Sequence, residues 1–142
     1  MSFLVDTNLL SELAPVKKPV PGELHNWFLA HEHELFLSVV TVVEIEHGIG
    51  LLRHKGASAK AGVISEWLDE VLELYGERIL PLDTPAARLA GMLLATAQGG
   101  GAAPGFEDAA IAATAQRHNL VVATRNTRHF MSMGVDHVNP RA

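Results

Sequence analysis

Phe3-Leu4-Val5-Asp6-Thr7-Asn8 is the stretch of this sequence that decides the fold. A short apolar run ends abruptly on a carboxylate, and two small polar residues follow it. This pattern predicts a buried strand that brings Asp6 to its carboxyl end, where open α/β sheets place their ligands. Asp6 could instead do no more than cap the next helix, since Asp and Asn are favoured at that position. On this stretch alone both interpretations stay open.

The composition indicates one compact globular unit. Of the 142 residues, 48% are hydrophobic and 19% are charged, so the chain can bury a real core and we expect a single domain over residues 1–142. The sequence has no cysteine, which excludes disulfides and a cysteine zinc site and fits a reducing compartment. It shows no signal-peptide pattern and no apolar run of membrane-spanning length, so we expect a cytoplasmic protein with no membrane partner.

The charge balance does not decide between classes of partner. The formal net charge is -5, with eight histidines, whereas nucleic-acid binding usually shows as a basic excess. A cluster of carboxylates that binds divalent cations would give the same balance. Net charge therefore leaves both a binding partner and a metal site open.

Apolar runs alternate with helical patterns along the whole chain. This alternation predicts a mainly parallel central sheet with helices on both faces, an α/β/α sandwich. Besides the first strand, we expect strands at 35–38, 78–83 and 120–124 and a weak one near 137–138. We expect helices at 9–13, from 21, from 41 to about 55, at 57–75, from 84 to the glycine run at 99–101, and at 106–118.

Three acidic residues lie at predicted strand ends or helix starts. Asp6 ends the first strand, and Glu44 is three residues after Thr41, the spacing of a capping box at a helix N-terminus. Asp108 is expected in the first turn of the helix at 106–118. In a right-handed α/β fold such positions gather at one edge of the sheet, although the position of Asp108 depends on a glycine-rich loop.

Carboxylates without cysteine or a fixed histidine pattern are hard oxygen ligands, which suit Mg²⁺ or Mn²⁺. Such a cluster typically serves phosphoryl chemistry, because the metal orients the scissile phosphate and generates a hydroxide nucleophile. The structural alternative is that Glu44 completes a capping box and that Asp108 only complements the helix dipole.

Four segments, in this order, carry a family resemblance: Leu4–Asn8, Glu44 within 42–45, Asp108 within 106–115, and 124–130 with the sequence Thr-Arg-Asn-Thr-Arg-His-Phe. Together they resemble the PIN domain and, among PIN domains, the VapC/FitB-type toxins of bacterial type II toxin–antitoxin pairs. The resemblance spans nearly the whole chain.

The resemblance implies a Mg²⁺- or Mn²⁺-dependent endoribonuclease that hydrolyses RNA phosphodiester bonds with a metal-activated water. It also implies a cognate antitoxin that holds the enzyme inactive, and a homodimer. Asp6, Glu44 and Asp108 would be the metal-binding acids. Thr124 and Asn126 would bind the metal through water or position the attacking hydroxide.

Two positions depart from the pattern of the family. Asn126 stands where many relatives have a fourth acid, and His129 stands where many have Asp. The missing carboxylate leaves open whether one metal ion or two operate. Glu107 is interpreted as a solvated acid, because adjacent helical residues point about 100° apart.

Several other residues are candidates for contacts with partners. Arg125 and Arg128 follow a strand end beside the predicted site, so they are candidate phosphate contacts. Lys17, Lys18, Arg53 and Lys55 are interpreted as ordinary solvated charges. The apolar stripe from Val63 to Tyr75 is interpreted mainly as core, but its width would also permit a dimer or antitoxin face.

Two competing functions remain. The chain could be a catalytically weak interaction module that keeps its acids only for folding. It could also be a phosphohydrolase with an Asp nucleophile, but that chemistry needs a second Asp two residues after the first, and Asn8 occupies this position.

Overall fold

The computed structural model describes residues 1–16 and 19–141. Lys17 and Lys18, interpreted above as solvated charges, lie outside the described residues. In the part of the chain that is described, no helix is both long enough and apolar enough to cross a membrane.

The centre of the molecule is a parallel sheet of five strands in the order β3-β2-β1-β4-β5. All pairings between neighbouring strands are parallel, as the alternation of strands and helices predicted. The first strand lies in the middle, and Leu4 is in register with Phe36 on one side and with Val122 on the other. The strands are β1 (Phe3–Val5), β2 (Leu35–Ser38), β3 (Ile79–Leu80), β4 (Val121–Ala123) and β5 (His137–Val138).

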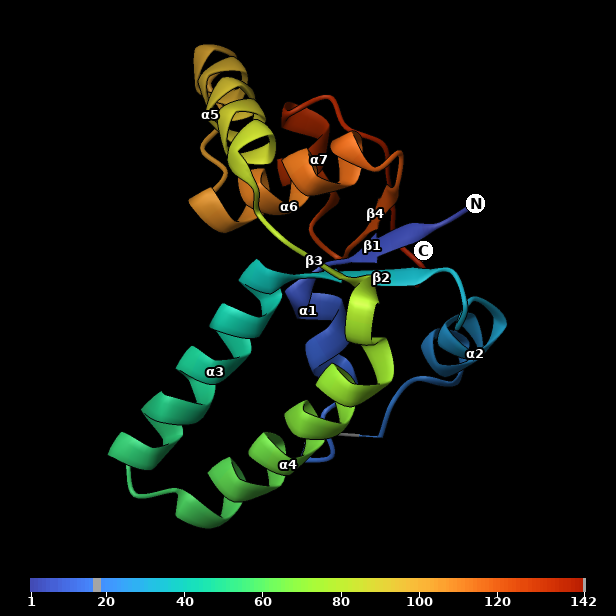
Figure 1. Cartoon of the computed structure of the whole chain (residues 1–142), viewed down its shortest axis with the longest axis vertical. Coiled ribbons are helices and arrows are strands. Elements are labelled where there is room, and N and C mark those ends of the chain that lie inside the picture. The colour runs from blue at the N-terminus through green and yellow to red at the C-terminus, as the bar shows by residue number, and fades with distance from the viewer. Residues whose placement is uncertain (17–18, 142) are drawn as a thin grey trace.

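Helices cover both faces of this sheet, which confirms the predicted α/β/α sandwich (Figure 1). One face carries α1 (Thr7–Leu10), α2 (Gly22–Ala30), α3 (Val39–His54) and α4 (Ser58–Tyr75). The other carries α5 (Thr84–Gly99), α6 (Phe106–Arg117) and α7 (Thr127–Ser132). Two short 3₁₀ helices, η1 (Ser11–Leu13) and η2 (Gly76–Arg78), follow α1 and α4.

The alternation of side chains along β1 gives the molecule a core on each face of the sheet. Phe3 and Val5 pack with residues of α1 to α4, whereas Leu4 packs with residues of α5, α6 and α7. In α6 the run Ala109–Ala113 is completely buried. Small side chains at these positions let the helix approach both α5 and the sheet closely.

The start of α3 differs from the sequence prediction. The helix begins at Val39, and Ser38, the last residue of β2, is its N-cap and accepts a hydrogen bond from the Val40 N–H at 3.0 Å. The prediction of Thr41 as N-cap was therefore wrong, and Glu44 lies in the second turn. The physical reason is that the strand passes directly into the helix without a loop, so the serine that ends the strand also caps the helix.

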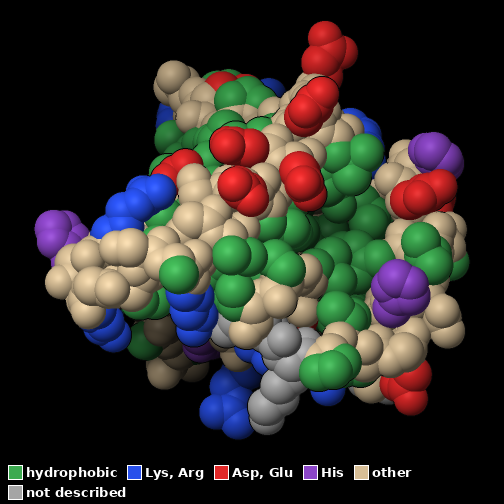
Figure 2. Space-filling model, turned by 90° about the horizontal axis from the view of Figure 1, so that it is seen from below, with side chains coloured by type: hydrophobic (Ala, Val, Ile, Leu, Met, Phe, Trp, Pro, Cys, Tyr) green, Lys and Arg blue, Asp and Glu red, His purple; other side chains and the backbone are tan. Residues whose placement is uncertain are grey.

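A hydrophobic groove lies between α1, α2 and α4, with a volume of about 370 Å³. Seen from below, hydrophobic side chains form a hollow bordered by histidine and acidic side chains (Figure 2). Trp67 and Val71 line the groove from α4, and Phe28 lines it from α2. Leu74, also in its wall, is 72% exposed. The apolar stripe of α4 thus serves partly as core and partly as an open surface.

Ser38→Ala removes the N-cap of α3, and we expect it to lower the free energy of unfolding by about 1 kcal/mol in a urea titration. Ser58→Ala, in the exposed first position of α4, makes no capping contact and should change stability by less than about 0.5 kcal/mol. Equal losses in the two variants would contradict the capping role of Ser38.

Candidate active site

The register of β1 against β4 places Asp6 beside Thr124, 118 positions later in the chain. Val5 is in register with Ala123, and the Asp6 N–H continues the ladder by donating to the Ala123 carbonyl at 2.9 Å. The Thr124 hydroxyl, itself buried, donates to Asp6 Oδ2 at 2.7 Å. Parallel pairing thus holds the Asp6 carboxylate at the carboxyl ends of two neighbouring strands.

Asp6 is also the N-cap of α1, since its Oδ1 accepts a hydrogen bond from the Thr7 N–H at 2.8 Å. The capping interpretation of Asp6 is therefore correct, and it does not compete with a role in the site. The cap occupies one carboxylate oxygen and Thr124 orients the other.

Glu44 reaches the same place from α3, where Thr7 holds it. Thr7 Oγ1 lies 2.6 Å from Glu44 Oε1 and 2.9 Å from the hydroxyl of Thr41. An ionised carboxylate only accepts hydrogen bonds, so Thr7 donates to Glu44 and accepts from Thr41. Glu44 is thus bound to the residue next to Asp6, and the capping-box interpretation of Glu44 was wrong.

Asp108 lies in the first turn of α6, as predicted, and two groups contact its carboxylate. Its Oδ2 lies 2.7 Å from His129 Nδ1, an ion-pair distance when the imidazole is protonated, and 3.3 Å from the N–H of Gly105, the N-cap. The weak bond to Gly105 shows that Asp108 also serves its own helix terminus. His129, from α7, thus orients Asp108 in the first turn of α6.

The acids are close enough to affect one another electrostatically. Burial, together with the charges of Asp108 and Glu44, raises the pKa of Asp6 to about 6, although hydrogen bonds from Thr124 and Thr7 act in the opposite direction. Burial also raises the pKa of Glu44, and Glu107 and Asp108 add to this effect. Glu107, although exposed, therefore contributes negative charge to the cluster rather than only to solvent.

Such a cluster fits a hard divalent cation. Its electron-pair donors are carboxylate oxygens. Asp6 is buried, so its ionisation destabilises the folded protein, and a bound cation would offset this loss of stability. Within residues 1–16 and 19–141, however, no three acidic or histidine side chains already stand at the mutual distances of a formed metal centre. Asp6 and Glu44 are held by threonines and Asp108 by His129, rather than by one another.

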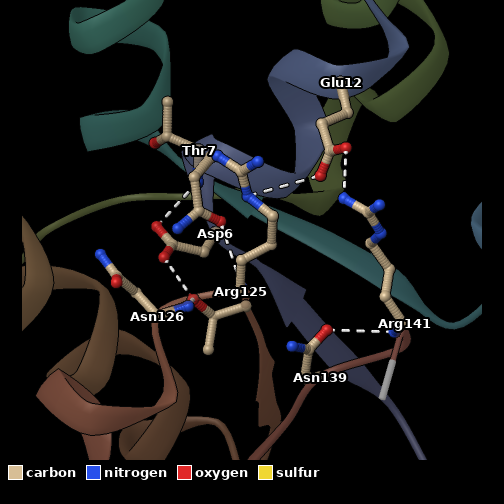
Figure 3. Close-up of polar contacts among 9 residues, drawn as sticks. Asp6, Thr7, Glu12, Arg125, Asn126, Asn139 and Arg141 are labelled. Carbon is tan, nitrogen blue, oxygen red and sulfur yellow. Dashed lines mark hydrogen bonds and ion pairs between the residues drawn. The ribbon is translucent and has the colours of Figure 1, made fainter.

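The remaining predicted residues follow the end of β4. The N–H of Asn126 donates to Thr124 Oγ1 at 2.8 Å, which joins Asn126 to the chain of hydrogen bonds that ends on Asp6 (Figure 3). Arg125 and Arg128 are both exposed, Arg125 directly after Thr124 and Arg128 on α7. The backbone of Arg125 is therefore next to Thr124, whereas that of Arg128 is next to His129.

Thr7 and Glu12 are residues that the sequence interpretation missed. Thr7 was noted only as a small polar residue, although its position directly after the strand-end Asp could have indicated a contact within the site. Glu12 contacts Arg125 Nε at 3.4 Å and Arg141 Nη1 at 2.9 Å. No local sequence pattern predicts the contact between Glu12 and Arg141, because the two residues are 129 positions apart.

Comparisons with known proteins find relatives that match nearly the whole chain. The family model described as PIN domain matches residues 3–134. Toxin FitB of Neisseria gonorrhoeae is 36% identical over 144 residues and covers 97% of both chains. The VapC ribonuclease Y4jK of Sinorhizobium fredii is 36% identical over 140 residues, which are 97% of this chain and 96% of the relative. The crystal structure of FitAcB from Neisseria gonorrhoeae matches with a TM-score of 0.86 and 34% identity over 98% of both chains.

The raised pKa of Asp6 gives a pH-dependent prediction for stability. The carboxyl binds its proton more tightly in the folded than in the unfolded protein, so the stability it contributes falls as the pH rises from about 4 to about 6. Asp6→Asn keeps an oxygen that accepts hydrogen bonds and removes the charge. In EDTA the variant should gain up to about 3 kcal/mol at pH ~8 and about half of that at pH ~5.

Urea titrations at the two pH values measure this gain. Asp69→Asn, an exposed position on α4, is the matched control and should gain nothing at either pH. A loss of stability in Asp6→Asn at the higher pH would contradict the buried, charged state of Asp6.

Proposed function

This chain belongs to the PIN domain family, and on that premise we propose that it is a metal-dependent endoribonuclease and the toxin of a toxin–antitoxin pair. One observation carries the proposal: three acids from separate elements, Asp6, Glu44 and Asp108, are close enough that the charges of Asp108 and Glu44 raise the pKa of Asp6. A relative of nearly equal length is named a ribonuclease, which supports RNA as the substrate class.

In this proposal Asp6, Glu44 and Asp108 hold Mg²⁺ or Mn²⁺. When bound, such an ion supplies Lewis-acid activation of water and neutralises charge on the reacting phosphate. The chain's own contribution is orientation. Thr124 fixes Asp6, Thr7 fixes Glu44 and His129 fixes Asp108, so each acid has a partner from a different element that limits its rotamers.

Thr124 acts through Asp6 in this arrangement. Its hydroxyl proton is directed at Asp6 and its oxygen accepts the N–H of Asn126, so it is a positioning residue. The Asn126 side chain is neutral, which leaves the site with fewer negative charges than four acids would give. Glu107 offsets part of this difference through its charge near Glu44.

The proposed partner protein is an antitoxin that covers the groove between α1, α2 and α4. The related chain named Toxin FitB supports a toxin role, and the groove supplies a mainly apolar surface on which such a partner could bind. Exposed Leu29 and Leu74 on the groove suit the apolar face of an amphipathic helix. The antitoxin would thus bind on the face of the sheet from which Glu44 projects.

The test of catalysis is incubation of the purified protein with assorted RNAs and Mg²⁺ or Mn²⁺, with and without EDTA. We expect cleavage that needs the metal, and a fall of more than about 100-fold in Asp6→Asn and Asp108→Asn. Asp136→Asn is a control outside the site. Metal-dependent cleavage that survives both active-site substitutions would point to a contaminating nuclease and contradict the proposed site.

A second test measures metal binding without activity. A saturating concentration of Mn²⁺ should raise the melting temperature of the wild-type protein, because a ligand that binds only the folded state stabilises it. At about 100 times the dissociation constant the gain is about 2.7 kcal/mol, or several degrees. The gain should vanish in Asp6→Asn and Asp108→Asn. An interaction module that keeps its acids only for folding would show the same gain, or none, in all three proteins.

A further inference from the structure

A polar hollow of about 430 Å³ lies beside the proposed metal site. Asn8 and Ser11 line it from α1 and η1, and Arg125 lines it from the turn after β4. Two of its lining residues are close to the site in the chain, since Asn8 is two residues after Asp6 and Arg125 directly follows Thr124. Glu12 and Arg141 complete the polar lining.

Glu12 joins the two arginines. Its side chain is only 18% exposed, and its two oxygens lie 3.4 Å from Arg125 Nε and 2.9 Å from Arg141 Nη1. Figure 3 shows the guanidinium groups reaching this one carboxylate from two sides. Two positive charges therefore share one negative charge, and the trio has a net charge of about +1.

The backbone of both arginines is also tied down. The Arg125 N–H donates to Asn8 Oδ1 at 3.4 Å, and the Arg141 N–H donates to Asn139 Oδ1 at 3.0 Å. The hollow thus brings together η1, the turn after β4 and the segment after β5. Each arginine thus has a backbone hydrogen bond and an ion-pair contact with Glu12, and for Arg141 that contact is also a hydrogen bond.

The guanidinium groups keep donors for a ligand. Each contacts Glu12 through one nitrogen, and the side chains of Arg125 and Arg141 are 47% and 39% exposed. An arginine has five N–H donors, so each can still bind an anion in the bidentate manner that suits phosphate. The hydroxyl of Ser11 and the amide of Asn8 offer hydrogen bonds to a sugar. Among the described residues that line the hollow there is no aromatic ring for base stacking.

We infer that this hollow binds the RNA phosphate next to the scissile one, with Arg125 and Arg141 as its ligands and Glu12 as the positioning residue. The inference rests on the RNA-cleaving function proposed above and assigns the neighbouring subsite of that same site. Phosphodiester strands carry one charge per nucleotide, so a cation-binding cluster and a guanidinium pair side by side match two successive phosphates.

The test is binding of a short fluorescein-labelled single-stranded RNA in EDTA, followed by fluorescence anisotropy over a series of salt concentrations. EDTA prevents cleavage, so binding is measured apart from catalysis. Each lost phosphate contact should reduce the slope of log K against log salt by about 0.7. We expect this reduction in Arg141→Ala and in Arg125→Ala. Arg88→Ala, an exposed arginine on α5, is the matched control and should leave the slope unchanged.

Glu12→Gln separates positioning from net charge. Removal of a negative charge should by itself tighten RNA binding, whereas loss of the clamp on both guanidinium groups should weaken it. We expect weaker binding, by about threefold or more, and in cleavage assays a rise in KM that exceeds the fall in kcat. The melting temperature of each variant checks that the fold persists.

Tighter RNA binding by Glu12→Gln, or an unchanged salt slope in Arg141→Ala, would overturn the inference. The inference would also be overturned if the protein bound an acidic peptide and not RNA, and if Arg141→Ala abolished that binding, since the hollow would then bind a protein carboxylate. If no RNA is cleaved but the slopes fall as expected, the subsite stands and the catalytic proposal fails. If RNA is cleaved and the salt slopes do not change, the catalytic proposal stands and the proposed subsite fails.

Discussion

The hydrogen bond from the Thr124 hydroxyl to Asp6 Oδ2 is the contact on which the rest of the site depends. It links the ends of two adjacent parallel strands and holds a carboxylate that is almost entirely buried. Burial and two neighbouring acids raise the pKa of this group to about 6. Hydrogen bonds from Thr7 and Thr124 favour the ionised form of the group. The folded protein is less stable with this buried charge, but the charged carboxylate is the form that could bind a cation.

The same principle organises the other acids. Each approaches from its own element and is steadied by a neutral or cationic partner: Glu44 by Thr7, Asp108 by His129. Because like charges repel, each acid is bound to such a partner and not to another acid. A few residues after Asp6 in the chain, Glu12 forms a group with Arg125 and Arg141 that has a net positive charge, because two guanidinium groups contact one carboxylate. Opposite charges in adjacent places suit a ligand with repeated phosphates and an associated cation.

Much of the fold could be predicted because apolar periodicity reports burial directly. The unbroken apolar run Phe3–Val5 predicted the central strand, and the burial of its side chains in two cores follows from the pleat of the strand. The error at Thr41 has a local cause. The spacing of a capping box is present, but Ser38 ends β2 and caps α3 at once, so the helix starts three residues earlier. A motif of four residues cannot tell where the strand before it stops.

By itself the sequence determined the parallel α/β/α architecture and the family, and it predicted the three candidate acids, because strand hydrophobicity and the order of short motifs are local properties. Only the tertiary structure decided which groups hold those acids. The pairs Thr7–Glu44, Asp6–Thr124 and Glu12–Arg141 join positions far apart in the chain. Their contacts depend on strand register and on the direction in which each helix leaves the sheet. Asp6 depends on both. The sequence of β1 places its carboxylate at the end of the strand, where it caps α1, and the register against β4 brings Thr124 to it.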